Sequence, residues 1–231
     1  MAMPGVVLLA GLGTWQVERL KWKAALIAER EARLARAVAT LDEMPESAGN
    51  LNFRRVAVRG EYLHDQEFHL LSRTSKGRAG IHVVTPFAPR PALSGFQVIL
   101  INRGWVPNEL ISPQRRRAGQ IEGVVDVAGI VRTDSKRRGW FTPENDPTAG
   151  VWHHVDIEQM ADVLGSTVAP FIVEADAPPI PGGYPVGGQT RTKLRNDHLE
   201  YAITWYTLAA ALVIIYLTFA VRELKRHSKE H

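Results

Sequence analysis

The chain has 231 residues, no cysteine and a formal net charge of +4 at pH 7. Without cysteine it forms no disulfide bond and offers no thiolate ligand, and its four scattered methionines make no thioether cluster for a metal. The basic residues gather beside the uncharged segments and do not alternate with aromatic residues. Membrane lipids are therefore the expected partners of these cations, and no nucleic-acid partner is expected.

The first segment is apolar. Residues 1–17 carry no charged side chain, and Glu18 and Arg19 end this stretch. A helix of this length spans about 25 Å, the short limit for a bilayer crossing. A cleaved signal peptide is the alternative, but no Lys or Arg precedes the apolar residues, and Gly-Thr-Trp at 13–15 is a poor cleavage site. We predict a retained transmembrane helix.

Beyond this segment the apolar residues keep a helical spacing, which predicts one continuous helix to about residue 42, with Pro45 as its stop. The period then changes to two, and Gly, Pro or Ser stands at the joints between short apolar runs. This pattern is typical of an antiparallel sheet that forms a barrel or a sandwich. The predicted strands cover residues 56–61, 68–71, 81–85, 98–106, 125–131 and 169–175.

One short helix is predicted among the strands, over Ile157–Leu164. Asp156 is its expected N-cap, Gln159 follows three residues later, and Gly165 ends it. Residues 178–188 contain four Pro and four Gly and predict a linker or an irregular loop.

The last apolar segment is the longest. Residues 201–221 contain no Lys, Arg, Asp, Glu or His, and Tyr201, Trp205 and Tyr206 near its start are typical of an interfacial aromatic belt. The expected fold is a membrane protein with two transmembrane helices flanking an α+β, β-rich, antiparallel barrel-like extramembrane domain. Its parts are a first transmembrane helix (1–18), the domain (19–195), a second transmembrane helix (196–222) and a basic cytoplasmic tail (223–231).

The topology follows from the number of spans. Two spans place both termini on one side of the membrane, and the basic tail favours the cytoplasm for that side. The domain is then periplasmic. A bacterial inner membrane is expected rather than a mitochondrial one, because no Arg- and Ser-rich segment precedes the first span.

Signatures of common enzymes are absent from the sequence: it has no P-loop, no H-E-x-x-H and no G-x-S-x-G. We therefore expect no catalytic activity. The alternative is a membrane-anchored hydrolase, for which His82, His153 or His154 with Asp156 is the only plausible set.

His198 lies three residues before the uncharged segment, with Tyr201 and Trp205 on the same predicted helix face. Two interpretations are open. The residue is either an interfacial histidine that meets headgroups or caps the helix, or an axial haem ligand flanked by an aromatic wall.

Four motifs in order resemble the surfeit-locus-one family of cytochrome c oxidase assembly factors. They extend from residue 11 to residue 219, nearly the whole chain. The motifs are Gly-Thr-Trp-Gln at 13–16 with Arg19 and Trp22-Lys23; residues 98–107, Val-Ile-Leu-Ile-Asn-Arg-Gly-Trp-Val-Pro; Asn-Asp-Pro at 145–147 with Trp152 and Asp156; and residues 195–202, Arg-Asn-Asp-His-Leu-Glu-Tyr-Ala, followed by Thr204, Trp205 and Tyr206.

The resemblance implies an assembly factor that binds haem a, with His198 as the axial ligand of the iron, and assists its insertion into oxidase subunit I. Trp15 is the expected opposite wall, and Gly11 and Gly13 would let the spans approach. The haem propionates are expected to meet cations at the same membrane face, namely Arg19, Lys21, Lys23, Arg191, Lys193 and Arg195.

The alternative is a structural chaperone that holds subunit I or the haem a synthase without ligating haem. Other motif residues have structural interpretations. Arg103 is expected to bond loop carbonyls, Trp105 to be a buried indole, and Asn145 to cap a turn.

Overall fold

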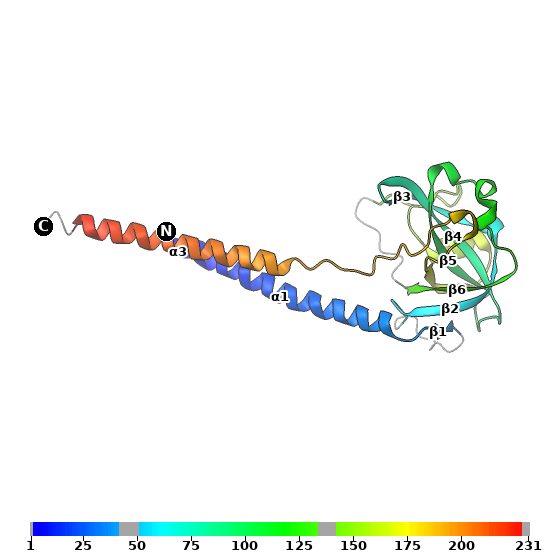
Figure 1. Cartoon of the computed structure of the whole chain (residues 1–231), viewed down its shortest axis with the longest axis horizontal. Coiled ribbons are helices and arrows are strands. Elements are labelled where there is room, and N and C mark those ends of the chain that lie inside the picture. Colours follow the sequence, from blue (N-terminus) through cyan, green and yellow to red (C-terminus); the bar gives the residue numbers. More distant parts are fainter. Residues whose placement is uncertain (1, 42–50, 134–141, 228–231) are drawn as a thin grey trace. The chain divides into compact units, whose positions relative to one another are not determined.

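The structure, a computed structural model of the whole chain, describes residues 2–41, 51–133 and 142–227 (Figure 1). Two compact units make up the chain. One joins Met1–Glu31 to Thr192–His231, and the other is Ala32–Arg191.

The larger unit is built on one sheet. Its strands are β1 (Ala39–Thr40), β2 (Arg55–Tyr62), β3 (Phe68–Ser75), β4 (Arg78–Pro89), β5 (Val98–Pro107), β6 (Val124–Arg132) and β7 (Val168–Ala175). The spatial order is β1-β2-β6-β7-β5-β4-β3, and β2 also pairs with β4. Because β2 bonds to β6 on one side and to β4 on the other, the sheet closes on itself. The predicted barrel-like, β-rich domain is confirmed.

All the predicted strands are present, but the sheet is not wholly antiparallel. β5 and β7 run parallel, as do β1 and β2. The reason is the order of insertion: the chain passes through β6 and helix α2 before β7 enters between β6 and β5. β7 therefore lies antiparallel to β6 and parallel to β5.

β5 is the central strand of the fold, as its apolar sequence predicts. Every residue from Val98 to Pro107 is buried. Side chains of a strand alternate between its faces, so Ile99 and Ile101 join one core cluster while Leu100 joins another. The second cluster lies under α2 and includes Met160, which is fully buried.

Helix α2 (Ile157–Leu164) has the predicted ends. The Asp156 side chain accepts a hydrogen bond from the Gln159 amide over 3.2 Å. Gly165 has φ of 60°, the left-handed conformation that glycine adopts without a steric penalty.

A bulge interrupts β5 at Arg103. Val84 pairs with Asn102 and Val83 with Gly104, so Arg103 is the extra residue. Gly104 has φ of +112°, and a Cβ there would lie 2.0 Å from the Val186 carbonyl oxygen. This position needs glycine, because the chain at Val186 packs directly on the strand.

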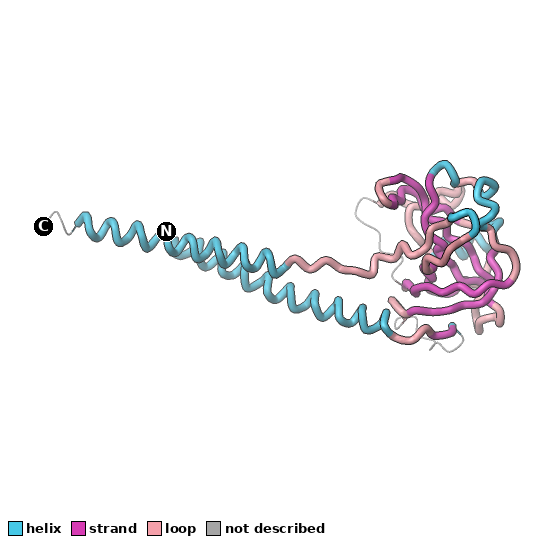
Figure 2. Tube along the Cα trace, viewed as in Figure 1, coloured by secondary structure: helices cyan, strands magenta, loops and turns pink. Residues whose placement is uncertain are grey.

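The Pro- and Gly-rich segment 178–188 is an irregular loop held on the sheet. The amide of Trp105 donates to the Val186 carbonyl over 2.9 Å, and the Val186 amide donates back over 2.8 Å. After this loop, residues 189–197 have no regular secondary structure (Figure 2).

The smaller unit contains most of α1 (Ala2–Ala35) and all of α3 (His198–His227). The predicted extension of the first helix to residue 42 is wrong. α1 ends at Ala35 because Ala39–Thr40 pairs with β2 and Leu41 is buried in the barrel core. Pro45, the predicted stop, lies outside the described residues.

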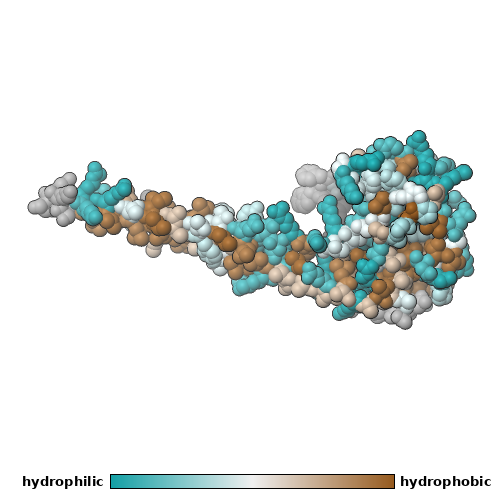
Figure 3. All heavy atoms as spheres, viewed as in Figure 1, coloured by the Kyte–Doolittle hydropathy of each residue, from teal (hydrophilic) through white to brown (hydrophobic). Residues whose placement is uncertain are grey.

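Among the described residues, α3 alone is long and apolar enough to cross a membrane, over His198–Arg226. Apolar side chains gather along the helical unit in Figure 3. α1 is a continuous helix, but it becomes charged from Glu18 onward, so its apolar part is too short to meet the same criterion. The second predicted span is supported by length and composition, whereas the first stays a prediction.

Candidate functional site

Helices α1 and α3 contact each other through small residues. A Cβ on Gly13 would lie 2.9 Å from the Tyr206 ring, and one on Gly5 would lie 3.1 Å from Leu212. On α3, Ala202 is buried at this contact. Small side chains let helix backbones approach closely, as predicted for Gly13. The prediction for Gly11 is wrong, since a Cβ there would meet nothing within 4 Å.

The closest polar contact between the two helices joins His198 to Gln16. The Nδ1–H of His198 donates to the Oε1 of Gln16 over 2.7 Å. Gln16 is only 9% exposed, so its amide lies inside the helix contact. A neutral imidazole that carries its proton on Nδ1 keeps a lone pair on Nε2, the nitrogen that can then ligate a metal.

The contact of Gln16 with His198 was not predicted from the sequence. The available signal was a polar side chain within the uncharged first segment, three residues after Gly13 and hence on the same helix face. Trp15, the residue that was expected to face His198, lies about 100° away around the helix. Its ring is 53% exposed and lies beside Arg19, whose guanidinium carbon is 5.9 Å from the ring centroid.

The other predicted site residues are spread around this contact. Tyr201 is 55% exposed and Trp205 is half-buried, both on α3. Arg19 stacks closer to Trp22, at 4.6 Å. Arg195 donates to the Asp197 carboxylate over 2.5 Å, and its side chain is otherwise exposed.

Asn196, two residues before α3, also contacts α1. Its Nδ2 donates to the Leu20 carbonyl over 3.4 Å. Its Oδ1 is buried and has no hydrogen-bond partner among the described residues. One acceptor therefore remains beside His198 for a donor group of a ligand or a water molecule.

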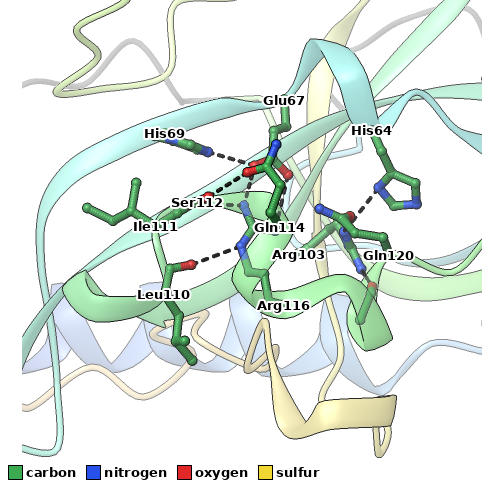
Figure 4. Close-up of polar contacts among 11 residues, drawn as sticks. His64, Glu67, His69, Arg103, Leu110, Ile111, Ser112, Gln114, Arg116 and Gln120 are labelled. Atoms are coloured by element: carbon green, nitrogen blue, oxygen red, sulfur yellow. Dashed lines mark hydrogen bonds and ion pairs between the residues drawn. The ribbon is translucent and has the colours of Figure 1, made fainter.

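The domain contains a second polar cluster, drawn in Figure 4, around the bulge in β5. Arg103 donates to the Gly119 carbonyl and, over 3.0 Å, to Gln120 Oε1. Its guanidinium lies 4.7 Å from the ring centroid of Tyr62. Arg103 is buried and bonds a backbone carbonyl, as its structural interpretation expects, although that carbonyl belongs to the last residue of a 3-10 helix and not to a loop. Trp105 is the buried indole that was expected.

The same cluster contains a buried ion pair. The guanidinium of Arg116, on the 3-10 helix η5 (Pro113–Gly119), bonds the carboxylate of Glu67, and His69 Nε2 lies 2.7 Å from Glu67 Oε1. Burial by itself would raise the pKa of Glu67, but the hydrogen bonds from His69 and Arg116 outweigh it and hold the pKa below its ordinary value. Glu67 is thus ionised and anchors η5 to the start of β3 (Figure 4).

In the hydrolase alternative, His82 and Asp156 are both engaged in contacts that stabilise the fold. Burial, with a smaller effect of Arg73, lowers the pKa of His82 to about 4, and its Nδ1 lies 3.3 Å from Asn102 Nδ2. Asp156 is the N-cap of α2 and so is engaged with the backbone. Asn145 does more than cap a turn, because its Oδ1 accepts from the amides of His153 and His154 while its Nδ2 donates to Gln159.

The described residues contain no group of three or more His, Asp or Glu side chains that could hold a metal ion. The fold and this site define a class of protein: a barrel domain joined to a helix that is long and apolar enough to cross a membrane, with one imidazole held at the start of that helix.

The chain belongs to the SURF1 family, whose sequence model matches residues 3–210. It is 42% identical to the human protein named Surfeit locus protein 1 over 217 residues, which cover 87% of this chain and 70% of that protein. The mouse Surfeit locus protein 1 is 41% identical, with 92% and 72% covered. A SURF1-like protein of Caenorhabditis elegans is 36% identical, with 89% and 68% covered.

Proposed function

We propose that this chain is an assembly factor for cytochrome c oxidase that binds haem a through His198 and assists its insertion into subunit I. Membership of the SURF1 family supports the role in oxidase assembly. The observation that carries the haem-binding part is the Gln16–His198 hydrogen bond, which leaves the Nε2 of His198 as the ligating nitrogen.

The residues fit the requirements of a haem carrier. His198 would supply one protein ligand to the haem iron, and a single protein ligand suits a haem that has to be handed on. Tyr201 and Trp205 supply apolar surface on the helix that bears His198. When bound, the haem would bring a redox-active iron. The chain's own residues would hold, orient and release it, with no catalytic step assigned to them.

The alternative proposal is a structural chaperone that holds oxidase subunit I or the haem a synthase and ligates no haem. In that case the Gln16–His198 bond serves helix packing only. The visible spectrum of the full chain, purified in detergent from cells that make haem a, separates the proposals. A haem band at a stoichiometry near one supports the carrier, and its absence overturns it and favours the chaperone.

We propose that Arg19 and Arg195 pair with the haem propionates at the membrane face. Arg19 follows Gln16 by three residues and Arg195 precedes His198 by three, and a cation beside a carboxylate forms a charge-assisted hydrogen bond. Combined Arg19→Ala and Arg195→Ala substitutions are expected to lower haem occupancy several-fold while the protein inserts normally. Occupancy is measured from the spectrum, and insertion by carbonate extraction of membranes. Unchanged occupancy would mean that these cations meet lipid headgroups instead.

We further propose that both termini are cytoplasmic and that the barrel domain lies on the periplasmic side of a bacterial inner membrane. The apolar α3 supports membrane attachment, and the basic residues after it favour the cytoplasm for the C-terminus. Alkaline phosphatase fused at Gly95, in the barrel domain, is expected to be active, and green fluorescent protein fused after His231 is expected to fluoresce. A Gly95 fusion that works only with the fluorescent reporter would contradict this placement.

A further inference from the structure

We infer that Gln16 is a positioning residue for the haem ligand: it accepts the Nδ1 proton of His198 and thereby presents Nε2 to the iron. This inference rests on the proposed function and deepens it. The residue touches neither iron nor porphyrin, and it acts through the imidazole alone. Its contribution is to select one of the two neutral tautomers of His198 and to fix the plane of the ring.

The contact between Gln16 and His198 joins an acceptor that carries no hydrogen to a ring nitrogen. Gln16 Oε1 has no hydrogen, so the 2.7 Å contact requires a proton on His198 Nδ1. The tautomer with its proton on Nε2 would place two lone pairs against each other. An imidazole that ligates a metal through one nitrogen nearly always donates its other N–H to a fixed acceptor, which orients the ring and raises its basicity.

The acceptor, the side-chain amide of Gln16, is buried. Gln16 lies in the contact between α1 and α3, where Gly13 and Ala202 bring the backbones close together and the amide is 9% exposed. An amide that is removed from water and committed to one partner has a defined position. Gln16 also lies on the helix opposite to the one that carries His198, so the ligand is set in place only when the two helices pair.

The inference is tested in two arms with the full chain in lipid nanodiscs. In the first arm the histidines are labelled with ¹⁵N, and the NMR spectrum is recorded at a pH at which the imidazole rings are neutral. The His198 signals are identified by their loss in His198→Ala. The wild-type ring is expected to carry its proton on Nδ1. Gln16→Leu is expected to shift the population toward the Nε2 proton, and Gln16→Glu, which keeps an acceptor, is expected to restore the wild-type form.

In the second arm haem a is titrated into the same proteins. Gln16→Leu is expected to weaken haem binding about 10–100-fold, the usual effect of removing the hydrogen-bond partner of a ligating histidine. Gln16→Glu is expected to bind at least as tightly as wild type. The matched control is Thr14→Val, which removes the 3.0 Å hydrogen bond between Thr14 and Tyr206 in the same helix pair but leaves Gln16 and His198 in place.

The outcomes separate this inference from the proposed function. If wild type takes up no haem, the proposed function falls and the inference falls with it. If wild type binds haem and Gln16→Leu binds it equally, or if the tautomer is the same in both, the inference falls and the proposed function stands. A loss in Thr14→Val as large as that in Gln16→Leu would also overturn the inference, because helix packing would then explain the effect.

Discussion

Replacing His198 with Ala is expected to reduce the haem content of the purified protein to background. The substitution removes the imidazole that Gln16 holds at the start of α3, and with it the proposed axial ligand. The protein itself should still insert, since the remaining contacts of α1 with α3 run through Gly13, Ala202 and Leu212. The measurement is the visible spectrum per mole of protein, from cells that make haem a.

Loss of haem could also follow from a disturbed helix pair, so the experiment needs two controls. His153→Ala changes a histidine of the barrel domain whose backbone amide, not its side chain, bonds Asn145 Oδ1 over 2.9 Å, and it should keep the wild-type spectrum. Added imidazole should restore a haem band to His198→Ala by filling the space of the lost ring. A wild-type spectrum in His198→Ala would remove this residue as the ligand.

Glu67→Gln is expected to destabilise the barrel domain by about 3–5 kcal/mol, because it leaves the Arg116 charge without a counter-ion in the interior. The side chains of Arg116 and Glu67 are 2% and 5% exposed, so water cannot replace the lost carboxylate. The effect is large against a total stability of about 5–15 kcal/mol for a folded domain. The measurement is urea unfolding of the full chain in detergent, followed by near-ultraviolet circular dichroism.

Two further variants test the reason for the loss. Glu67→Leu combined with Arg116→Met removes both charges and keeps the volume, so it should be less destabilising than Glu67→Gln. Some cost remains, since the carbonyls of Leu110 and Ile111 lose their guanidinium donor. Asp126→Asn is the surface control: its pair with Arg59 is 72% and 63% exposed, and the expected loss is about 0–1 kcal/mol. Equal losses in Glu67→Gln and Asp126→Asn would contradict the argument.

Much of the domain could be predicted from local patterns. Alternation or short apolar runs identified every strand from β2 to β7, because the burial of a strand's faces is visible in its own sequence. The Asp156 cap and Gly165 marked both ends of α2, since capping is a local interaction. β1 was missed: it has only two residues and continues from a helical pattern, and its conformation depends on pairing with β2.

Only one of the two residues of the site, His198, could be predicted from the sequence. His198 stands out as a titratable residue at the start of an apolar helix, and its motif resembles that of a known family. Its partner could not be deduced, because 182 positions separate Gln16 from His198 and helical period alone does not say which residues of two helices meet. The sequence analysis predicted that Trp15 lies opposite His198, whereas the residue that contacts His198 is its neighbour Gln16.

The sequence by itself determined the class of domain, the apolar helix α3 and the histidine at its start, since each of these depends on residues close together in the chain. Tertiary structure alone decided the closure of β2 on β4, the insertion of β7 beside β5, the bulge that buries Arg103, and the hydrogen bond from His198 to Gln16. The physical reason is shared. A local pattern predicts which face of a helix or strand is buried. The segment that packs on that face is determined by packing and hydrogen bonding between residues far apart in the sequence.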